Sequence, residues 1–188
     1  MLTLRPAAET DRDTIRRWRN QPDVARWMYT DHEIGEDEHA AWFARHLASP
    51  GERSWIIELD GRGVGAVNLT DIEPAGGAEW GIYVAEPTAR GTGAAHGAAF
   101  LSLEQAFGPL GLMRVTCEAI ADNDRAIRLY ERVGFRRKGH RRAHVRRGDV
   151  LLDVVELGLL AAEWAVLRSG QRDRLVSRGV LGEDVPHE

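Results

Sequence analysis

The sequence predicts a single mixed α/β (α+β) domain in which helices cover the faces of a sheet. About seven strand-like runs alternate with segments of helical periodicity, in the order β-α-α-β-β-β-α-β-α-β-β. The chain has 188 residues, of which 43% are hydrophobic, enough to fill one core. A glycine-bearing loop also joins one strand-like run to a long Ala-rich helical segment.

The strands are identified by apolar runs that end at turn signals. Asp60-Gly61-Arg62 is typical of a tight hairpin turn, and Arg147-Gly148-Asp149 marks another hairpin near the end of the fold. Residues 74–77, Pro-Ala-Gly-Gly, turn the chain into a further strand. The expected strands are 2–5, 54–59, 63–72, 79–84, 114–120, 135–145 and 150–157.

The helices are identified by their caps and apolar faces. Thr10 or Asp11 can cap the first, and three acidic residues occupy the first turn of the second. Asn123 caps a later helix that Gly134 ends. The expected helices are 11–20, 36–47, 93–107, 124–133 and 161–168. The predicted domain spans residues 1–168, and a polar, loosely held tail covers 169–188.

Charge and composition exclude several classes of function. A net charge of −4 argues against a nucleic-acid partner. Basic residues are nevertheless concentrated in 136–147, where they form either a solvated hairpin face or a steering patch for an anionic ligand. No apolar run reaches the roughly 18 residues of a membrane span. The single cysteine, Cys117, fits a reducing compartment, so we expect a cytoplasmic protein. His39 and His46 lack the spacing and the third ligand of a metal site.

The most informative segment is the loop over residues 87–95, which follows the expected strand 79–84. Gly91 and Gly93 carry no Cβ and can adopt positive φ, so the backbone can approach an anion closely. The helix that follows offers unpaired N–H groups and the positive end of its dipole. The pair is only G-x-G, and an ordinary tight turn is the alternative. The segment predicts a phosphorylated cofactor.

A second motif covers residues 122–135, with Asn, then Ala-Ile, then Leu-Tyr, then Gly-Phe. Together with the glycine loop, it resembles the acetyl-CoA-binding motifs of the Gcn5-related N-acetyltransferase (GNAT) superfamily. The likeness covers roughly residues 1–165, and Thr88 departs from the Gln or Arg common there. The resemblance implies the GNAT fold, a mixed and mostly antiparallel sheet of about seven strands, flanked by helices and splayed between the fourth and fifth strands.

The resemblance also implies acetyl-CoA as cosubstrate, with no metal. The implied binding groups lie at the end of the fourth strand, in the glycine loop and in the second motif. They are Ile82, Tyr83, Val84, Thr88, Ala89, Arg90, Gly91, Thr92, Gly93, Ala94, Asn123, Arg125, Ala126 and Tyr130.

Amine attack on a thioester needs a group that accepts the amine's proton and a donor for the leaving thiolate. Tyr130 is the expected donor, because a phenol with an ordinary pKa of about 10 is protonated at neutral pH. Glu118 and Glu79 are the candidate bases, with Glu118 slightly favoured as a mid-strand carboxylate among apolar residues. For each of these three residues a purely structural role is the alternative.

Residues 1–50 resemble enzymes that acetylate the 4-amino group of a UDP-4-amino-4,6-dideoxy sugar on the pseudaminic acid pathway. In such a site aromatic rings stack on uracil and arginines pair with the diphosphate. Packing of two helices on the sheet explains the same residues equally well. The expected acceptor residues are Arg17, Arg19, Met28, Tyr29, His39, Trp42 and Thr70.

Two further interpretations of function stay open. The acceptor can be another amine, namely a polyamine, an antibiotic or a protein N-terminus, because residues 69–79 resemble polyamine acetyltransferases and the acidic residues of 33–38 suit a polycation. Alternatively, the chain is a non-catalytic regulatory domain that binds acetyl-CoA. We expect a monomer or homodimer whose partner is a small-molecule amine.

Overall fold

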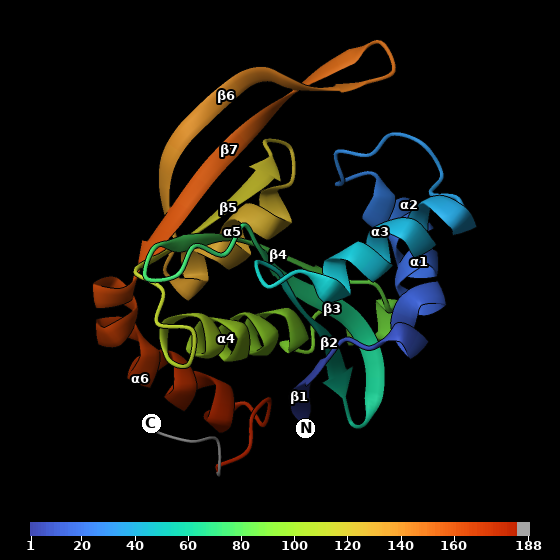
Figure 1. The fold of residues 1–188 in the computed structure, drawn as a ribbon. Coiled ribbons are helices and arrows are strands. Elements are labelled where there is room, and N and C mark those ends of the chain that lie inside the picture. The colour runs from blue at the N-terminus through green and yellow to red at the C-terminus, as the bar shows by residue number, and fades with distance from the viewer. Residues whose placement is uncertain (184–188) are drawn as a thin grey trace.

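Seven strands form one sheet in the order β1-β2-β3-β4-β5-β7-β6 (Figure 1). The structure, a computed structural model, describes residues 1–183. Only β4 and β5 pair in parallel, and all other neighbours are antiparallel, so the mixed, mostly antiparallel fold is confirmed. The strands are β1 (Leu2–Pro6), β2 (Arg53–Leu59), β3 (Arg62–Thr70), β4 (Gly77–Val84), β5 (Arg114–Ile120), β6 (Arg136–Arg147) and β7 (Val150–Leu160).

The sheet opens between β4 and β5. These strands pair only where Gly77–Glu79 faces Arg114–Thr116, and beyond that point the two strands diverge. β4 keeps its partner β3 as far as Val84, and β5 keeps its partner β7 as far as Ile120. The predicted splay is therefore confirmed, and it leaves one backbone edge of each strand without a neighbouring strand.

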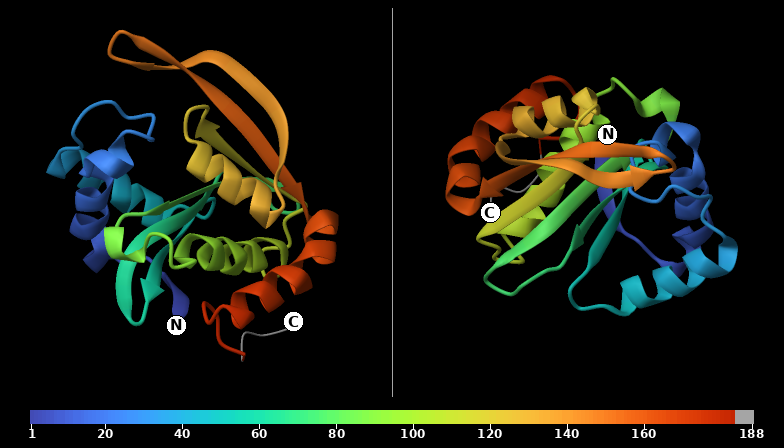
Figure 2. Two further views of the ribbon diagram at one scale, coloured as in Figure 1. Left: turned by 180° about the vertical axis from the view of Figure 1, so that it is seen from behind. Right: turned by 90° about the horizontal axis from the view of Figure 1, so that it is seen from above.

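Helices cover both faces of the sheet (Figures 1 and 2). They are α1 (Arg12–Asn20), α2 (Pro22–Ala25), α3 (Glu36–Ala48), α4 (Ala94–Phe107), α5 (Asp124–Val133) and α6 (Ala161–Ser177), with single 3₁₀ turns at Glu9–Asp11 and Pro87–Ala89. Strand alternation separates two apolar clusters. Trp55 and Ile57 join the main core with α4, α5 and α6, whereas Ile56 joins a smaller cluster with α1 and α3.

The C-terminal region differs from the prediction. α6 continues past Arg168 to Ser177, and Val180 and Leu181 are buried after it. The backbone oxygen of Val180 accepts a hydrogen bond from the Leu2 amide at 3.1 Å. This packing is not evident from the sequence, because it involves polar residues. Gln171 is buried, and its side-chain amide donates to backbone carbonyls of α5. Residues 184–188 of the predicted tail lie outside the described residues.

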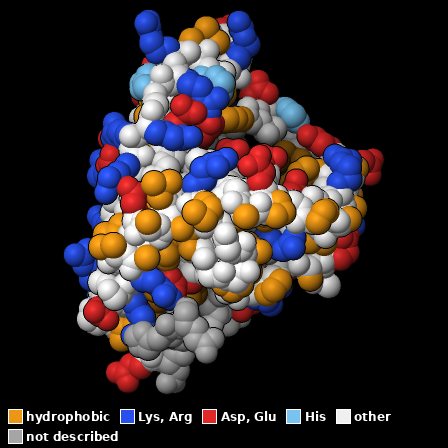
Figure 3. Space-filling view, turned by 60° about the vertical axis from the view of Figure 1, so that its left-hand side comes forward, with side chains coloured by type: hydrophobic (Ala, Val, Ile, Leu, Met, Phe, Trp, Pro, Cys, Tyr) orange, Lys and Arg blue, Asp and Glu red, His pale blue; other side chains and the backbone are white. Residues whose placement is uncertain are grey.

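The β6–β7 hairpin projects from the sheet and arches toward the segment that joins α2 to α3 (Figures 1 and 2). Figure 3 shows Lys and Arg side chains gathered at the top of the molecule, where this hairpin lies. Charged side chains on an edge strand disfavour pairing with another chain. The hairpin contacts the end of α2, where Arg147 donates to the Ala25 carbonyl oxygen at 3.1 Å. No helix among residues 1–183 is long and apolar enough to cross a membrane.

Candidate active site

The glycine loop presents unpaired backbone amides at the start of α4. Gly91 has φ of 85° and Gly93, the N-cap residue, has φ of 94°. Within residues 1–183 the N–H groups of Gly91, Thr92 and Gly93 have no hydrogen-bond acceptor. Such a cradle at a helix N-terminus suits a phosphate group, so these residues fit the pyrophosphate of acetyl-CoA.

The side chains of this loop are occupied elsewhere. Arg90 donates to Asp23 at 2.8 Å and to the Ala85 carbonyl at 3.1 Å, and it lowers the pKa of the Asp23 carboxyl. The Thr92 hydroxyl donates to the Ala89 carbonyl at 2.8 Å. Recognition of a phosphate at this loop therefore falls to the backbone, and Arg90 instead connects the loop to α2.

The second motif places Tyr130 inside the main core, next to the splay. Asn123 caps α5, and its side chain accepts from the Ala126 amide at 3.2 Å, while Arg125 is exposed. The Tyr130 ring lies edge-on to Trp80, with 5.3 Å between ring centroids. Burial raises the pKa of Tyr130 far above its usual value of 10, with smaller contributions from Cys117 and Tyr29. The phenol is thus a protonated donor throughout the physiological range.

Three carboxylates lie on neighbouring strands at the splay. Glu118 on β5 and Glu156 on β7 are directly opposite each other in register. Glu79 on β4 is opposite Thr116 and is exposed. The Tyr29 hydroxyl donates to Glu118 at 2.5 Å. Burial raises the pKa of Tyr29, and the charges of Glu79 and Glu156 contribute in the same direction. The cluster is therefore continuous from β4 to β7.

Arg141 of β6 is ion-paired with two of these carboxylates. Its Nη2 contacts Glu118 and lies 3.3 Å from Glu156. Its Nη1 donates to Nε2 of His144 at 2.8 Å, and the His144 ring lies edge-on to Tyr29. The segment after α2 and the β6–β7 hairpin thus meet over the carboxylates.

The structure brings only part of the predicted acceptor set to this cluster. Tyr29 joins it, and Thr70 lies opposite Glu79 in register. His39 is buried with its ring stacked near Phe43, and burial lowers its pKa. The remaining members lie around α1 and α3. Met28 and Trp42 pack on the smaller apolar cluster, Arg17 is exposed and bonded to Thr14, and Arg19 is half-buried on α1.

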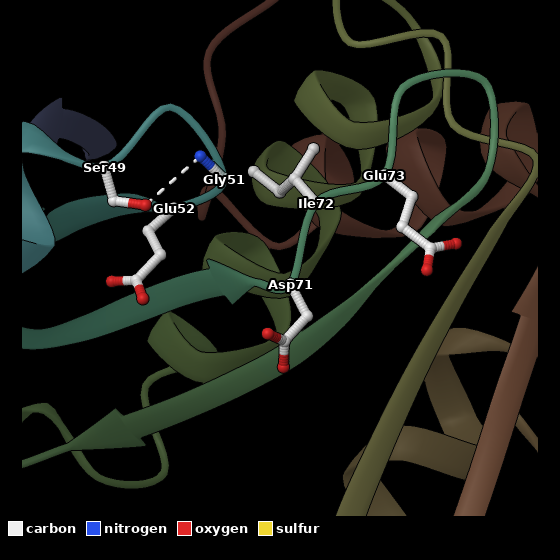
Figure 4. A pocket seen from close by; sticks show the side chains of 6 residues that line it. All are labelled: Ser49, Gly51, Glu52, Asp71, Ile72 and Glu73. Atoms are coloured by element: carbon white, nitrogen blue, oxygen red, sulfur yellow. Dashed lines mark hydrogen bonds between the residues drawn. The ribbon is translucent and has the colours of Figure 1, made fainter.

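Two hollows lie away from this cluster. One, of about 380 Å³, lies over α1 and includes Arg17 in its lining. The other, of about 260 Å³, lies between residues 49–52 and 71–73. In Figure 4 its carboxylates, Glu52, Asp71 and Glu73, point in different directions and do not converge on one atom. Among residues 1–183, no three His, Cys, Asp or Glu side chains are placed to hold a metal ion.

Sequence reasoning missed Glu156, Arg141 and His144 as parts of the site. Glu156 is placed by the register of β5 with β7, and Arg141 by irregularities in the pairing of β6 with β7. Neither can be read from spacing along the chain. The alternation that singled out Glu118 would have found Glu156 had the pairing of the two strands been known.

Comparison with known proteins gives consistent matches. The family model described as acetyltransferase (GNAT) domain matches residues 1–136. Spermidine N(1)-acetyltransferase of Escherichia coli K12 is 28% identical over 139 residues, which cover 73% of this chain and 74% of the relative. Its counterpart in Vibrio cholerae is 27% identical over 141 residues, which cover 74% of this chain and 81% of the relative.

A solved structure extends the similarity to most of the fold. The crystal structure of spermidine N-acetyltransferase from Vibrio cholerae in complex with CoA and spermine aligns with a TM-score of 0.81 and 25% sequence identity. The alignment covers 87% of this chain and 98% of that one.

Proposed function

Because this chain belongs to the GNAT acetyltransferase family and is an N-acetyltransferase that uses acetyl-CoA, we propose that its acceptor is an aliphatic polyamine. The observation on which the proposal rests is the carboxylate cluster of Glu79, Glu118 and Glu156, which lies at the splay and contacts Tyr29 through Glu118. Carboxylates on neighbouring strands suit the spaced ammonium groups of a polyamine. The spermidine acetyltransferases among the relatives support the same acceptor class.

The nucleotide-sugar interpretation has no comparable support. It needs arginines for a diphosphate and an aromatic floor for uracil. Arg17 instead donates to Thr14, and the His39 and Trp42 rings pack against each other at a tilt of 49° within α3. The relatives reported above acetylate spermidine, so the polyamine alternative replaces the sugar as the proposed acceptor.

Glu79 is the better candidate base in this arrangement. Glu118, favoured by the sequence, is bonded to Tyr29 and Arg141, which suits a binding role. Glu79 is exposed, and its carboxylate makes no ion pair or hydrogen bond within residues 1–183. We infer that Glu79, directly or through water, takes the proton that the attacking ammonium must lose.

The remaining groups act on the thioester. As the amine nitrogen forms its bond to the carbonyl carbon, backbone N–H groups on the open edge of β4 can stabilise the charge on the oxygen. The nitrogen loses its second proton to solvent, the carbon–sulfur bond breaks, and the Tyr130 hydroxyl donates its proton to the departing thiolate. Solvent returns a proton to the phenolate.

The experiment is CoA release from acetyl-CoA with spermidine, a UDP-4-amino-4,6-dideoxy sugar, an aminoglycoside and a short peptide. We expect turnover with spermidine, and a Glu79→Gln variant that loses far more in kcat than in spermidine affinity. Turnover confined to the sugar or the peptide would overturn the polyamine proposal. A Glu79→Gln variant with full kcat at every pH would remove Glu79 as base.

A further inference from the structure

The strand pairing places two like charges against each other. Glu118 and Glu156 are direct cross-strand partners on β5 and β7, where side chains stand about 4.5–5.5 Å apart at Cβ. Both are largely shielded, with side-chain exposures of 20% and 27%. Two carboxylates in this position repel unless a cation lies between them. The cross-strand pair is therefore a cation-binding unit.

In this structure the cation is the guanidinium of Arg141, on the neighbouring strand β6. One guanidinium nitrogen, Nη2, contacts both carboxylates, and Nη1 bonds to His144. The third nitrogen, Nε, is buried and has no hydrogen-bond partner among residues 1–183. The guanidinium is thus held at one end only, and 35% of the side chain is exposed to solvent.

The backbone of β6 is distorted where it presents this side chain. Arg141 pairs with Val154, yet the next ladder pair is Val145 with Leu152, so a bulge lies between them. Ala143, inside the bulge, has φ of 48°, and its amide donates to Asp153 at 2.7 Å. A bulge redirects side chains, and a non-glycine residue at positive φ marks a conformation that its surroundings impose.

We propose that Arg141 is a built-in competitor of the acceptor, occupying the Glu118–Glu156 pair in the free enzyme and leaving it when an ammonium group of the polyamine binds. The inference rests on the proposed function and adds a determinant of specificity. The exchange replaces one cation with another, so the net charge at the carboxylate pair is unchanged. A neutral acceptor gains nothing from displacing Arg141, and the residue therefore favours polycations over other amines.

This arrangement predicts two measurable properties. Removal of the guanidinium frees the carboxylate pair, so spermidine binds more tightly. In the absence of amine, the same change leaves Glu118 opposite Glu156 without a cation, so the protein is less stable until spermidine restores the charge balance. A merely structural role predicts the loss of stability without the selective rescue.

The experiment compares wild type, Arg141→Gln and Arg142→Gln. Arg142 is the matched control, because it is exposed, adjacent on β6 and makes no ion pair within residues 1–183. We expect Arg141→Gln to lower the KM for spermidine about fivefold, the scale of one partly exposed ion pair. Its Tm should be lower without spermidine and rise more with saturating spermidine than that of wild type. Arg142→Gln should follow wild type in both measurements.

The outcomes separate the two proposals. If wild type acetylates spermidine but Arg141→Gln has an unchanged or higher KM and no larger thermal shift, the competitor role is wrong and the proposed acceptor stands. If Arg141→Gln and Arg142→Gln have equal effects, the change in net charge alone explains them, and the competitor role of Arg141 is wrong. If none of the three proteins binds or acetylates spermidine, the proposed acceptor falls, and the role of Arg141 falls with it.

Discussion

The two sides of the splayed sheet present different chemical groups to the ligands that we propose for them. The proposed cofactor side presents the unpaired backbone amides of Gly91, Thr92 and Gly93, which are consecutive in the chain. The proposed acceptor side presents the side chains of Tyr29, Glu118, Glu156 and Arg141, which come from a connecting segment and three strands. Backbone recognition depends on conformation and tolerates few residue types, whereas side-chain recognition can be retuned by a single charge.

The largest effect is expected where the backbone conformation itself is changed. In Gly93→Ala, the new Cβ would lie 2.7 Å from a methyl group of Val180, at a φ of 94° that alanine disfavours. We expect the free energy of unfolding to fall by about 2–4 kcal/mol and acetyl-CoA affinity to fall at least about tenfold. Chemical denaturation and calorimetric titration with acetyl-CoA measure the two quantities.

The matched control is Gly170→Ala in α6. A Cβ at Gly170 meets no atom within 4 Å, and its φ is not positive. This substitution should raise the free energy of unfolding by about 0.5–1 kcal/mol and leave acetyl-CoA affinity unchanged. A stable Gly93→Ala protein that binds acetyl-CoA normally would break the distinction between the two sides.

The next largest effect concerns Tyr130, which is buried in the main core against Trp80 of β4. Tyr130→Phe removes the proposed proton donor and should lower kcat about 100-fold, with little change in affinity for either substrate. Burial raises the pKa of Tyr130, so the phenol stays protonated below that raised value and loses its proton only above it. Wild-type kcat should therefore show no fall due to Tyr130 between pH 7 and about 10, the ordinary pKa of tyrosine.

A pH profile of kcat for both proteins checks this assignment. A fall in wild-type kcat with a midpoint below pH 9 that disappears in Tyr130→Phe would contradict it. The same variant should keep its affinity for acetyl-CoA, because the substitution leaves the loop amides unchanged. A large loss of affinity would instead assign Tyr130 to cofactor binding.

The smallest effect is expected where the two sides touch. Arg90 of the cofactor loop pairs with Asp23 of α2, and both side chains are partly exposed. Arg90→Ala and Asp23→Ala should each weaken acetyl-CoA binding by about twofold to fivefold, the range of such an ion pair, and the double variant should be no worse. If Arg90→Ala alone costs more than tenfold, Arg90 binds the pyrophosphate directly.

The fold was predictable because most of its determinants are local. Asn123 and Gly134 mark α5 at its two ends, and the hairpin turn at Asp60-Gly61 fixes the β2–β3 pair. The end of α6 was not predictable in this way. Its buried Gln171 and the apolar pair Val180–Leu181 gain their role from contacts with distant parts of the chain.

The candidate site shows the same division. The glycine loop and Tyr130 lie in contiguous motifs, so spacing along the chain, together with the resemblance to the GNAT superfamily, was sufficient to single them out. Glu156 and Arg141 depend on which residues face each other across β5, β7 and β6. The bulge after Arg141 shifts that register, and alternation along one strand cannot reveal a shift in its partner.

The packing of Val180 has a practical consequence for handling the protein. Its methyl groups lie against the positions of Gly93 and Gly97 at the start of α4, and its carbonyl accepts from Leu2. Leu2 and Val180 therefore pack together against the start of α4 and stabilise the position of the glycine loop. A truncation before Val180, or a bulky fusion that displaces Leu2, would harm acetyl-CoA binding while every residue of the site remained in place.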